Sequence, residues 1–297
     1  MKHAMVLLVH QLPEQVNMFL EQIIETTNID VYVHINKKND NLRESILKND
    51  RICIIRDNVE ISWGGDGIIR AILATLKVIR DTNTQYGHVL INTGQDMIIK
   101  TGLDEFLEAH VNEIFFEGYK QDKKRRAFLL YKWPDKYRRL MDFKLNPYKI
   151  IRRLRLELFN LGFPFCKKNI SYPTDNVVFY RNWFWGALPL EVLHYILDFV
   201  DNKPDFMEIY TGALVPEEGF MLTLIMMSPY RDWIRFDEKG HSRSLTNVLD
   251  RSNGHPVVIR SNDVEELEKS DYFFARKFDV RIDKDVVHFY YKKILNK

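Results

Sequence analysis

The first hundred residues alternate between short apolar runs and longer stretches with helical spacing, and this alternation constrains the fold most strongly. Ala4 to Val9 is a continuous apolar run, and Glu14 to Thr26 places its apolar residues three or four positions apart. The pattern recurs, with strand-like runs at 30–35, 51–55 and 88–92 and a helical stretch at 67–80. Strands that alternate with helices predict an α/β fold with a mainly parallel central sheet.

The size and composition of the chain suit one compact domain. It has 297 residues, of which 45% are hydrophobic and 13% aromatic, enough to bury one large core or two modest ones. The formal net charge of +2 is close to neutral and identifies no partner by itself. We therefore predict a single domain over 1–297, with a basic, partly helical insertion at about 120–168.

Neither a disulfide framework nor a membrane span is indicated. Cys53 and Cys166 lack metal-ligand spacing, and we expect both to be buried thiols in a reducing compartment. The apolar run after Met1 is too short to span a membrane and lacks a cleavage site, and no later window reaches about 18 apolar residues. We therefore expect a cytoplasmic protein.

Three loops follow predicted strands, at 34–38, 61–67 and 93–101, and ligands of parallel α/β sheets gather at such loops. The second is rich in glycine, so its backbone near Gly64 could approach a phosphate or sugar closely. It matches neither the dinucleotide fingerprint nor the P-loop. In the third loop, Asp96 could bond a sugar hydroxyl or only cap the next turn.

The segment from Val215 to Thr223 combines a proline, two carboxylates and an apolar run. Pro216 suits the first turn of a helix, where Glu217 and Glu218 complement the positive end of the helix dipole. The rest of the helix is almost entirely apolar and is predicted to be buried, so a first-turn carboxylate could be held partly out of water, as a general base requires. Simple charge complementation of the helix remains an alternative interpretation.

Five segments of the chain, in order, match segments of one known family. They are Trp63-Gly64-Gly65, Leu90 to Asp96 with Ile99-Lys100-Thr101, Asn182-Trp183-Phe184 with Leu188 to Glu191, Pro216-Glu217-Glu218 with Thr223, and Phe273 to Asp279. In this order they resemble the W-G, NxSGQDxPxK, GSxWFxLxRE, P-D/E-E…T and LFARKFD segments of glycosyltransferase family 14. This is the core-2/I-branching β-1,6-N-acetylglucosaminyltransferase and peptide-O-xylosyltransferase family, and the chain resembles a bacterial member.

The resemblance implies a GT-A-like nucleotide-diphospho-sugar transferase fold and an inverting reaction. A sugar, in the first instance GlcNAc, would pass from a UDP-sugar to a hydroxyl of a glycan or lipid-linked oligosaccharide acceptor and form a β-linkage. Glu218 is the implied base, with Glu217 the adjacent candidate. The family works without a metal, so Lys277 and Arg276, with Arg260 as a further arginine, are expected to hold the diphosphate.

The remaining expected contacts follow from the same motifs. Asn36, Asp96 and Gly64 are expected on the donor side, with Asn36 standing where many members carry Asp. Trp63 and Trp183 are expected beside the sugars, since an indole face can stack on a sugar ring.

Two departures keep a second function open. Asn36 replaces an acidic residue, and Tyr180-Arg181 stands in place of Gly-Ser on the acceptor side. The chain could therefore be a non-catalytic protein that binds carbohydrate or nucleotide-sugar. No metal site is expected either, because the only Asp-x-Asp, at 283–285, follows the last motif and is interpreted as surface charge.

Residues 120–168 carry 16 Lys and Arg against 4 Asp and Glu, a net charge of +12 that leaves −10 for the rest of the chain. Within them, Pro147 to Phe163 interleaves basic and large apolar residues at helical spacing. Such a helix can lie peripherally on an anionic membrane, here the inner face of the cell membrane, where surface-polysaccharide acceptors reside. It can equally be a solvated or dimer-forming helix; nucleic-acid binding is the least favoured interpretation and is not expected.

Overall fold

The computed structural model describes residues 1–122, 126–134, 147–163, 167–250 and 256–297. Within them, the helices are α1 (Pro13–Thr26), α2 (Gly67–Asp81), α3 (Leu103–Ala109), α4 (Ala127–Leu130), α6 (Pro147–Asn160), α7 (Leu190–Asn202), α8 (Glu217–Met227), α9 (Val264–Glu268) and α10 (Lys284–Leu295). The strands are β1 (His3–Val9), β2 (Ile29–Ile35), β3 (Ile52–Ile54), β4 (His88–Thr93), β5 (Asp96–Ile98), β6 (Phe115–Lys120), β7 (Tyr180–Pro189), β8 (His241–Ser242), β9 (Thr246–Val248) and β10 (Phe274–Arg276).

Seven of the described strands form the central sheet, in the order β3-β2-β1-β4-β7-β6-β8. The pairs from β3 through β4 are parallel, whereas β7 runs antiparallel to both β4 and β6. Five of the seven strands therefore point in one direction, and only β7 and β8 point in the other. The predicted α/β class with a mainly parallel sheet is confirmed.

A second, three-stranded sheet has the order β5-β10-β9. Strand β5 follows β4 almost at once, whereas β10 comes from near the end of the chain. Their antiparallel register places Asp96 opposite Arg276. This sheet therefore joins two of the sequence motifs that suggested a function.

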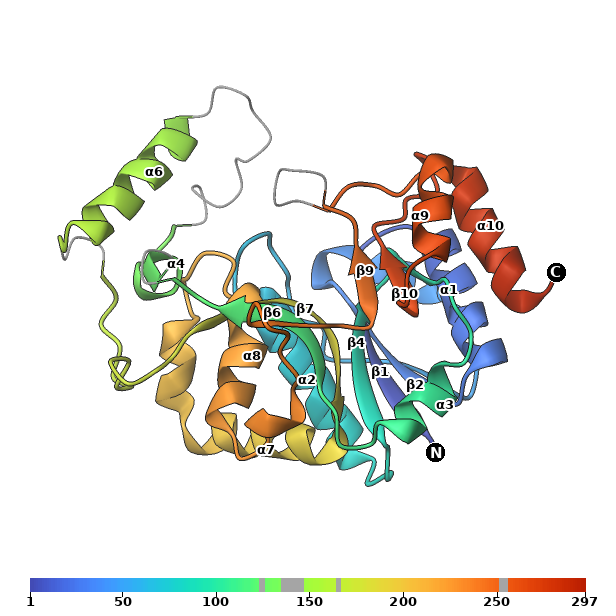
Figure 1. The fold of residues 1–297 in the computed structure, drawn as a ribbon, viewed down its shortest axis with the longest axis horizontal. Helices are drawn as coiled ribbons and strands as arrows, with labels where there is room; N and C mark the ends of the chain where they lie inside the picture. The colour runs from blue at the N-terminus through green and yellow to red at the C-terminus, as the bar shows by residue number, and fades with distance from the viewer. Residues whose placement is uncertain (123–125, 135–146, 164–166, 251–255) are drawn as a thin grey trace.

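Strand β1 is apolar at every position after the first, and does not alternate between apolar and polar residues, because both of its faces are buried. Ala4, Val6 and Leu8 face one hydrophobic core, which they share with α2, α7 and α8. The residues between them, including Met5 and Leu7, face a second core formed with α1, α10 and the small sheet. Successive side chains of a strand point to opposite faces, so a sheet covered on both sides needs apolar residues throughout. Figure 1 shows the helices of the two cores on either side of the sheet.

The basic segment of the sequence is partly helical where the structure describes it, with helices at 127–130 and 147–160. Helix α4 follows β6 in the chain, and α6 stands off from the body of the molecule (Figure 1). Among the described residues, no helix is long and apolar enough to cross a membrane.

One expectation about the cysteines is wrong. Cys53 is exposed, because it lies on β3, which is the edge strand of the central sheet and is only three residues long. The apolar neighbours Ile52 and Ile54 predicted a buried strand, but an edge strand has a sheet partner on one side only. Cys166 lies outside the described residues.

Candidate active site

The predicted loops meet at the edge of the sheet where β1, β2 and β4 end. The backbone N–H of Asn36, just past β2, donates to Val9 at 2.8 Å, and that of Gly94, just past β4, donates to Leu8 at 3.0 Å. The Asn36 side chain also bonds the next loop, donating to the Ile61 carbonyl at 2.9 Å and accepting from its N–H at 3.1 Å. Asn36 thus fastens two loops together, a role that the sequence did not predict.

Gly64 connects this edge to the helix that carries the two glutamates. Its φ of +67° is a left-handed conformation that glycine adopts without strain. Its carbonyl accepts a hydrogen bond from the N–H of Val215 at 3.0 Å, directly before Pro216. The adjacent Trp63 is 48% exposed, so its ring lies on the open side of the loop.

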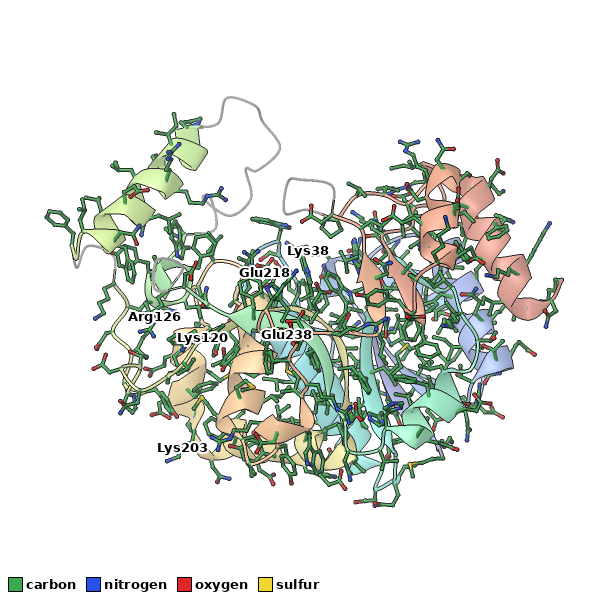
Figure 2. All side chains as sticks on the ribbon, in the orientation of Figure 1. Lys38, Lys120, Arg126, Lys203, Glu218 and Glu238 are labelled. Carbon is green, nitrogen blue, oxygen red and sulfur yellow. The ribbon has the colours of Figure 1, made fainter. Side chains whose placement is uncertain are left out.

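Glu218 lies in the first turn of α8 and lines a small pocket. Arg181 of β7 also lines this pocket, and its Nη2 lies 2.7 Å from Oε2 of Glu218. The remaining wall includes Leu129 of α4 and Val215, and the pocket of about 10 Å³ has room for about one water molecule. Figure 2 shows Glu218 at the same edge of the molecule as Lys38, which follows β2.

Helix α8 contacts β7 through two residues that follow Glu218, Gly219 and Thr223. Thr223 accepts a hydrogen bond at 3.0 Å from the N–H of Tyr180, the residue before Arg181. Gly219 allows β7 to come close, because a Cβ there would lie 3.3 Å from the Tyr180 carbonyl oxygen. Together these contacts hold the Arg181 side of β7 against the first turn of α8.

Glu217 is set differently from its neighbour. It is 8% exposed, and Oε2 of its carboxyl finds no hydrogen-bond partner among the described residues. Burial, with the adjacent Glu218 charge, raises the pKa of Glu217 to about 8. Glu217 is therefore protonated at neutral pH and faces the protein interior, whereas Glu218 faces the pocket.

Arg276 makes contacts other than the one expected of it. Its guanidinium lies 2.8 Å from Asp96, hydrogen-bonds the Thr93 hydroxyl and stacks over the Trp185 ring at 4.1 Å. Asp96 is fully buried and also accepts from the N–H of Thr93 and the amide of Asn92. This pair fixes the small sheet to the end of β4 through Nη1 of Arg276, whereas Nε of Arg276 has no hydrogen-bond partner among the described residues.

Lys277 is the cation that follows this pair in the chain. It is half-buried, as its position between two buried phenylalanines suggested, and no hydrogen bond or ion pair joins its ammonium to any described residue. Burial, with the neighbouring Arg276 charge, lowers the pKa of Lys277. A lysine in such a setting is suited to bind an anion.

His10 and Arg281 lie close to Lys277, and the sequence did not identify either as a site residue. Loss of water around its ring, with the charges of Arg276, Lys277 and Arg281, lowers the pKa of His10. Arg281 is bidentate to Asp279, at 2.9 and 2.6 Å. His10 directly follows β1, so the rule that ligands gather beyond strand ends could have identified it.

Two further positions were singled out from the sequence. Arg260 is exposed and follows Ile259, whose N–H donates to the Lys277 carbonyl at 2.8 Å. Trp183 is half-buried and packs against Trp185 with ring centroids 5.5 Å apart. Trp185, and not Trp183, is the tryptophan that contacts a predicted site residue, because its ring lies under the guanidinium of Arg276.

Asp283, interpreted from the sequence as surface charge, caps a helix. Its carboxylate accepts from the N–H of Val286 in the first turn of α10 and from Ser261. In the part of the chain that the structure describes, no group of three or more His, Cys, Asp or Glu side chains is arranged to hold a metal ion. The metal-free reaction remains a prediction.

Comparisons with known proteins add little to this geometry. No family model and no curated protein matches the chain, so its resemblance to glycosyltransferase family 14 also remains a prediction. Among solved structures, mouse xyloside xylosyltransferase 1 is similar at 10% identity and a TM-score of 0.40, over 93% of this chain and 97% of that one. A 4-diphosphocytidyl-2C-methyl-D-erythritol synthase from Anaerococcus prevotii is similar at 12% identity and a TM-score of 0.31, over 70% and 82%. Likenesses of this size do not bear on function, so the site itself must indicate it.

Proposed function

We propose that the chain is an inverting, metal-independent glycosyltransferase that moves a sugar from a UDP-sugar to a hydroxyl of a glycan acceptor. The observation that carries the proposal is the presence of Glu218 in its pocket and of the cation Lys277 at the same edge of the sheet. The uridine, the choice of GlcNAc and the β-1,6 linkage rest on the family resemblance alone.

In the proposed reaction, Glu218 removes the proton from the attacking acceptor hydroxyl. Single displacement needs this base on the side of the sugar opposite the leaving nucleotide. Arg181 fixes the orientation of the carboxylate through the contact between its Nη2 and Oε2 of Glu218 at 2.7 Å. The buried Glu217 is a poor base at neutral pH because its pKa of about 8 keeps it protonated and its carboxyl does not face the pocket.

The leaving diphosphate needs positive charge. Lys277 supplies an ammonium without an acceptor among the described residues, His10 lies near it, and Arg260 follows the residue that bonds its backbone carbonyl. Arg276 supports Lys277 as its neighbour in the chain and through its buried bond to Asp96. We assign Arg276 a positioning role.

Calorimetry with a panel of nucleotides and UDP-sugars, with and without EDTA or Mn²⁺, tests the proposal. We expect UDP binding that EDTA does not change. Glu218→Gln should lose turnover by at least about 100-fold and keep UDP binding, whereas Lys277→Ala should weaken UDP binding itself. Binding only with Mn²⁺, or normal turnover by Glu218→Gln, would contradict the proposal.

A non-catalytic sugar-binding protein of the same fold is the second candidate. The ion pair between Arg181 and Glu218 favours it, because a carboxylate already bonded to a guanidinium at 2.7 Å is a weaker base. Slow hydrolysis of a UDP-sugar by the purified protein, lost in Glu218→Gln, distinguishes the two. A binding protein should show UDP-sugar binding and no hydrolysis.

A further inference from the structure

Helix α6 exposes a row of large apolar side chains on one side. Ile150 is 71% exposed and Leu154 58%, and their separation of four positions places them on one face of α6. Ile151, 36% exposed, lies beside them on the helix, and Leu161 and Phe163, 73% and 45% exposed, lie just beyond its last residue. A contiguous apolar surface of this kind marks an interaction site on a globular domain. We call these five residues the outer face of α6.

The other side of α6 is the side that attaches to the body of the protein. The ring of Phe159 packs edge-on against Tyr131 with centroids 5.0 Å apart. Arg155 lies 5.0 Å over the ring of Trp133 and donates to the Lys132 carbonyl at 2.7 Å. Since attachment uses this opposite side, the exposed apolar residues are not turned toward the core. Figure 1 shows α6 standing off from the body of the protein.

The positive charge of α6 indicates which kind of partner the outer face can bind. From 147 to 163 the chain has four Lys and Arg and one Glu, a net charge of +3. A second copy of the chain docked through the same face would bring two such charges together. A nucleic acid would leave the aliphatic residues without a partner. An anionic lipid surface offers both negative headgroups and an apolar layer beneath them.

We propose that the outer face of α6 docks on the surface of an anionic lipid bilayer. Ile150, Leu154 and Leu161 enter the boundary between headgroups and acyl chains, and Arg153, which is exposed beside them, lies among the headgroups. This docking requires no catalytic activity, so it stands apart from the proposed glycosyl transfer.

The attachment of α6 links this surface to the pocket of Glu218. Leu156 and Phe159 of α6 pack against a small hydrophobic cluster that contains Trp133 and Leu214. Leu214 also lines the pocket, in the turn before α8 begins. One layer of side chains therefore separates α6 from the pocket.

Co-sedimentation of the purified full chain with vesicles tests the proposal. Vesicles of phosphatidylcholine alone are compared with vesicles that contain phosphatidylglycerol, at low and high salt. We expect binding only to the anionic vesicles, weakened at high salt, and reduced about tenfold or more in Ile150→Asp/Leu154→Asp. The matched control is Ile282→Asp/Phe289→Asp, two apolar residues that are 46% and 43% exposed outside α6, and it should bind as the wild type does.

Circular dichroism and the melting temperature establish that each variant is folded, as expected for substitutions at exposed positions. Equal binding by the wild type and Ile150→Asp/Leu154→Asp would overturn the proposal, as would absence of binding to anionic vesicles. A dimer in light scattering that only the α6 variant dissociates, without vesicle binding, would assign the outer face to a second copy and would also overturn it.

Discussion

At the scale of single residues, the candidate site contains two adjacent glutamates with different surroundings. Glu218 faces a pocket and is paired with Arg181, whereas Glu217 is buried and its pKa is raised to about 8. The same first turn therefore contains a carboxylate that contacts a guanidinium and a carboxyl kept neutral by burial. Environment, not residue type, separates their roles.

Glu217→Gln is predicted to stabilise the protein increasingly between pH 5 and 8. In the unfolded chain Glu217 ionises near its ordinary pKa of 4.5, while in the folded protein it stays protonated up to about 8. Wild-type stability therefore falls over this window as pH rises, and glutamine, which does not titrate, removes the loss. We expect a gain of roughly 2–4 kcal/mol at pH 8 and little at pH 5, measured by urea denaturation.

Glu265→Gln is the control for this experiment, because Glu265 is 84% exposed and bonded to Lys269 on the surface of α9. Its denaturation curves should follow those of the wild type at both pH values. Parallel pH dependence in wild type and Glu217→Gln would show that Glu217 is not the group that titrates in this window.

Removal of Arg181 is predicted to lower turnover. Without the guanidinium 2.7 Å away, the carboxylate of Glu218 loses the contact that fixes its orientation toward the acceptor hydroxyl. We expect Arg181→Gln to lower kcat roughly 10- to 100-fold and to leave UDP binding unchanged. Arg181→Lys should retain most of the wild-type kcat. An unchanged kcat in Arg181→Gln would remove Arg181 from the mechanism.

At the scale of elements, the position of Glu218 depends on how α8 is held. The helix is apolar around its whole circumference and buried, so packing fixes its axis. Its first turn is fixed by the loop through Gly64 and by β7 through Thr223. The glycine-rich loop, which suggested a phosphate site, therefore also acts as a support for the candidate base.

Gly64→Ala is predicted to reduce both stability and turnover. An L-residue at φ +67° costs about 1–2 kcal/mol, and relaxing that strain would displace the carbonyl that holds Val215. Gly240→Ala is the matched control, since Gly240 also has a positive φ, +75°, in a turn with open space around it. Both variants should lose similar stability in urea, and only Gly64→Ala should lose turnover. Equal turnover in the two would contradict a supporting role for Gly64.

At the scale of the whole molecule, the site exists because two sheets are joined. The small sheet brings β10 from near the end of the chain to the carboxyl end of β4, and the buried pair of Asp96 and Arg276 closes the joint. Lys277 is the next residue after Arg276 in the chain, so the bond between Arg276 and Asp96 also fixes the position of Lys277. Lys277, a candidate site residue from the last part of the chain, therefore lies among loops from the first hundred residues.

Asp96→Asn is predicted to destabilise the protein by about 3–5 kcal/mol, because it leaves the Arg276 charge buried without its counter-ion. Affinity for UDP should fall with it, since Lys277 loses its support. Asp271→Asn is the control: Asp271 is 78% exposed and 3.5 Å from Lys100, so the change should cost about 0–1 kcal/mol. A similar small loss for both variants in urea denaturation would show that the buried pair does not hold the joint.

The sequence by itself determined the secondary structure of about the first third of the chain. Each strand and helix expected up to residue 93 is present within a few residues, because buried parallel strands must be apolar on both faces and surface helices on one. The carboxyl-end rule also placed Asn36, Gly64 and Gly94 near one another, since parallel strands end at one edge. The start of α8 at its proline and two glutamates followed from helix-terminus preferences alone.

Only the tertiary structure decided what the charged residues of the motifs do. Asp96 and Arg276, both expected at the donor, bond each other in the interior, because a contact between residues 180 positions apart depends on strand register rather than on local pattern. Arg181 was visible only as a departure from a motif, and its bond to Glu218 depends on the packing of β7 against α8. Glu217 is buried and Glu218 faces the pocket, and this difference depends on how the first turn of α8 packs. The sequence alone does not show which of two adjacent glutamates will be buried.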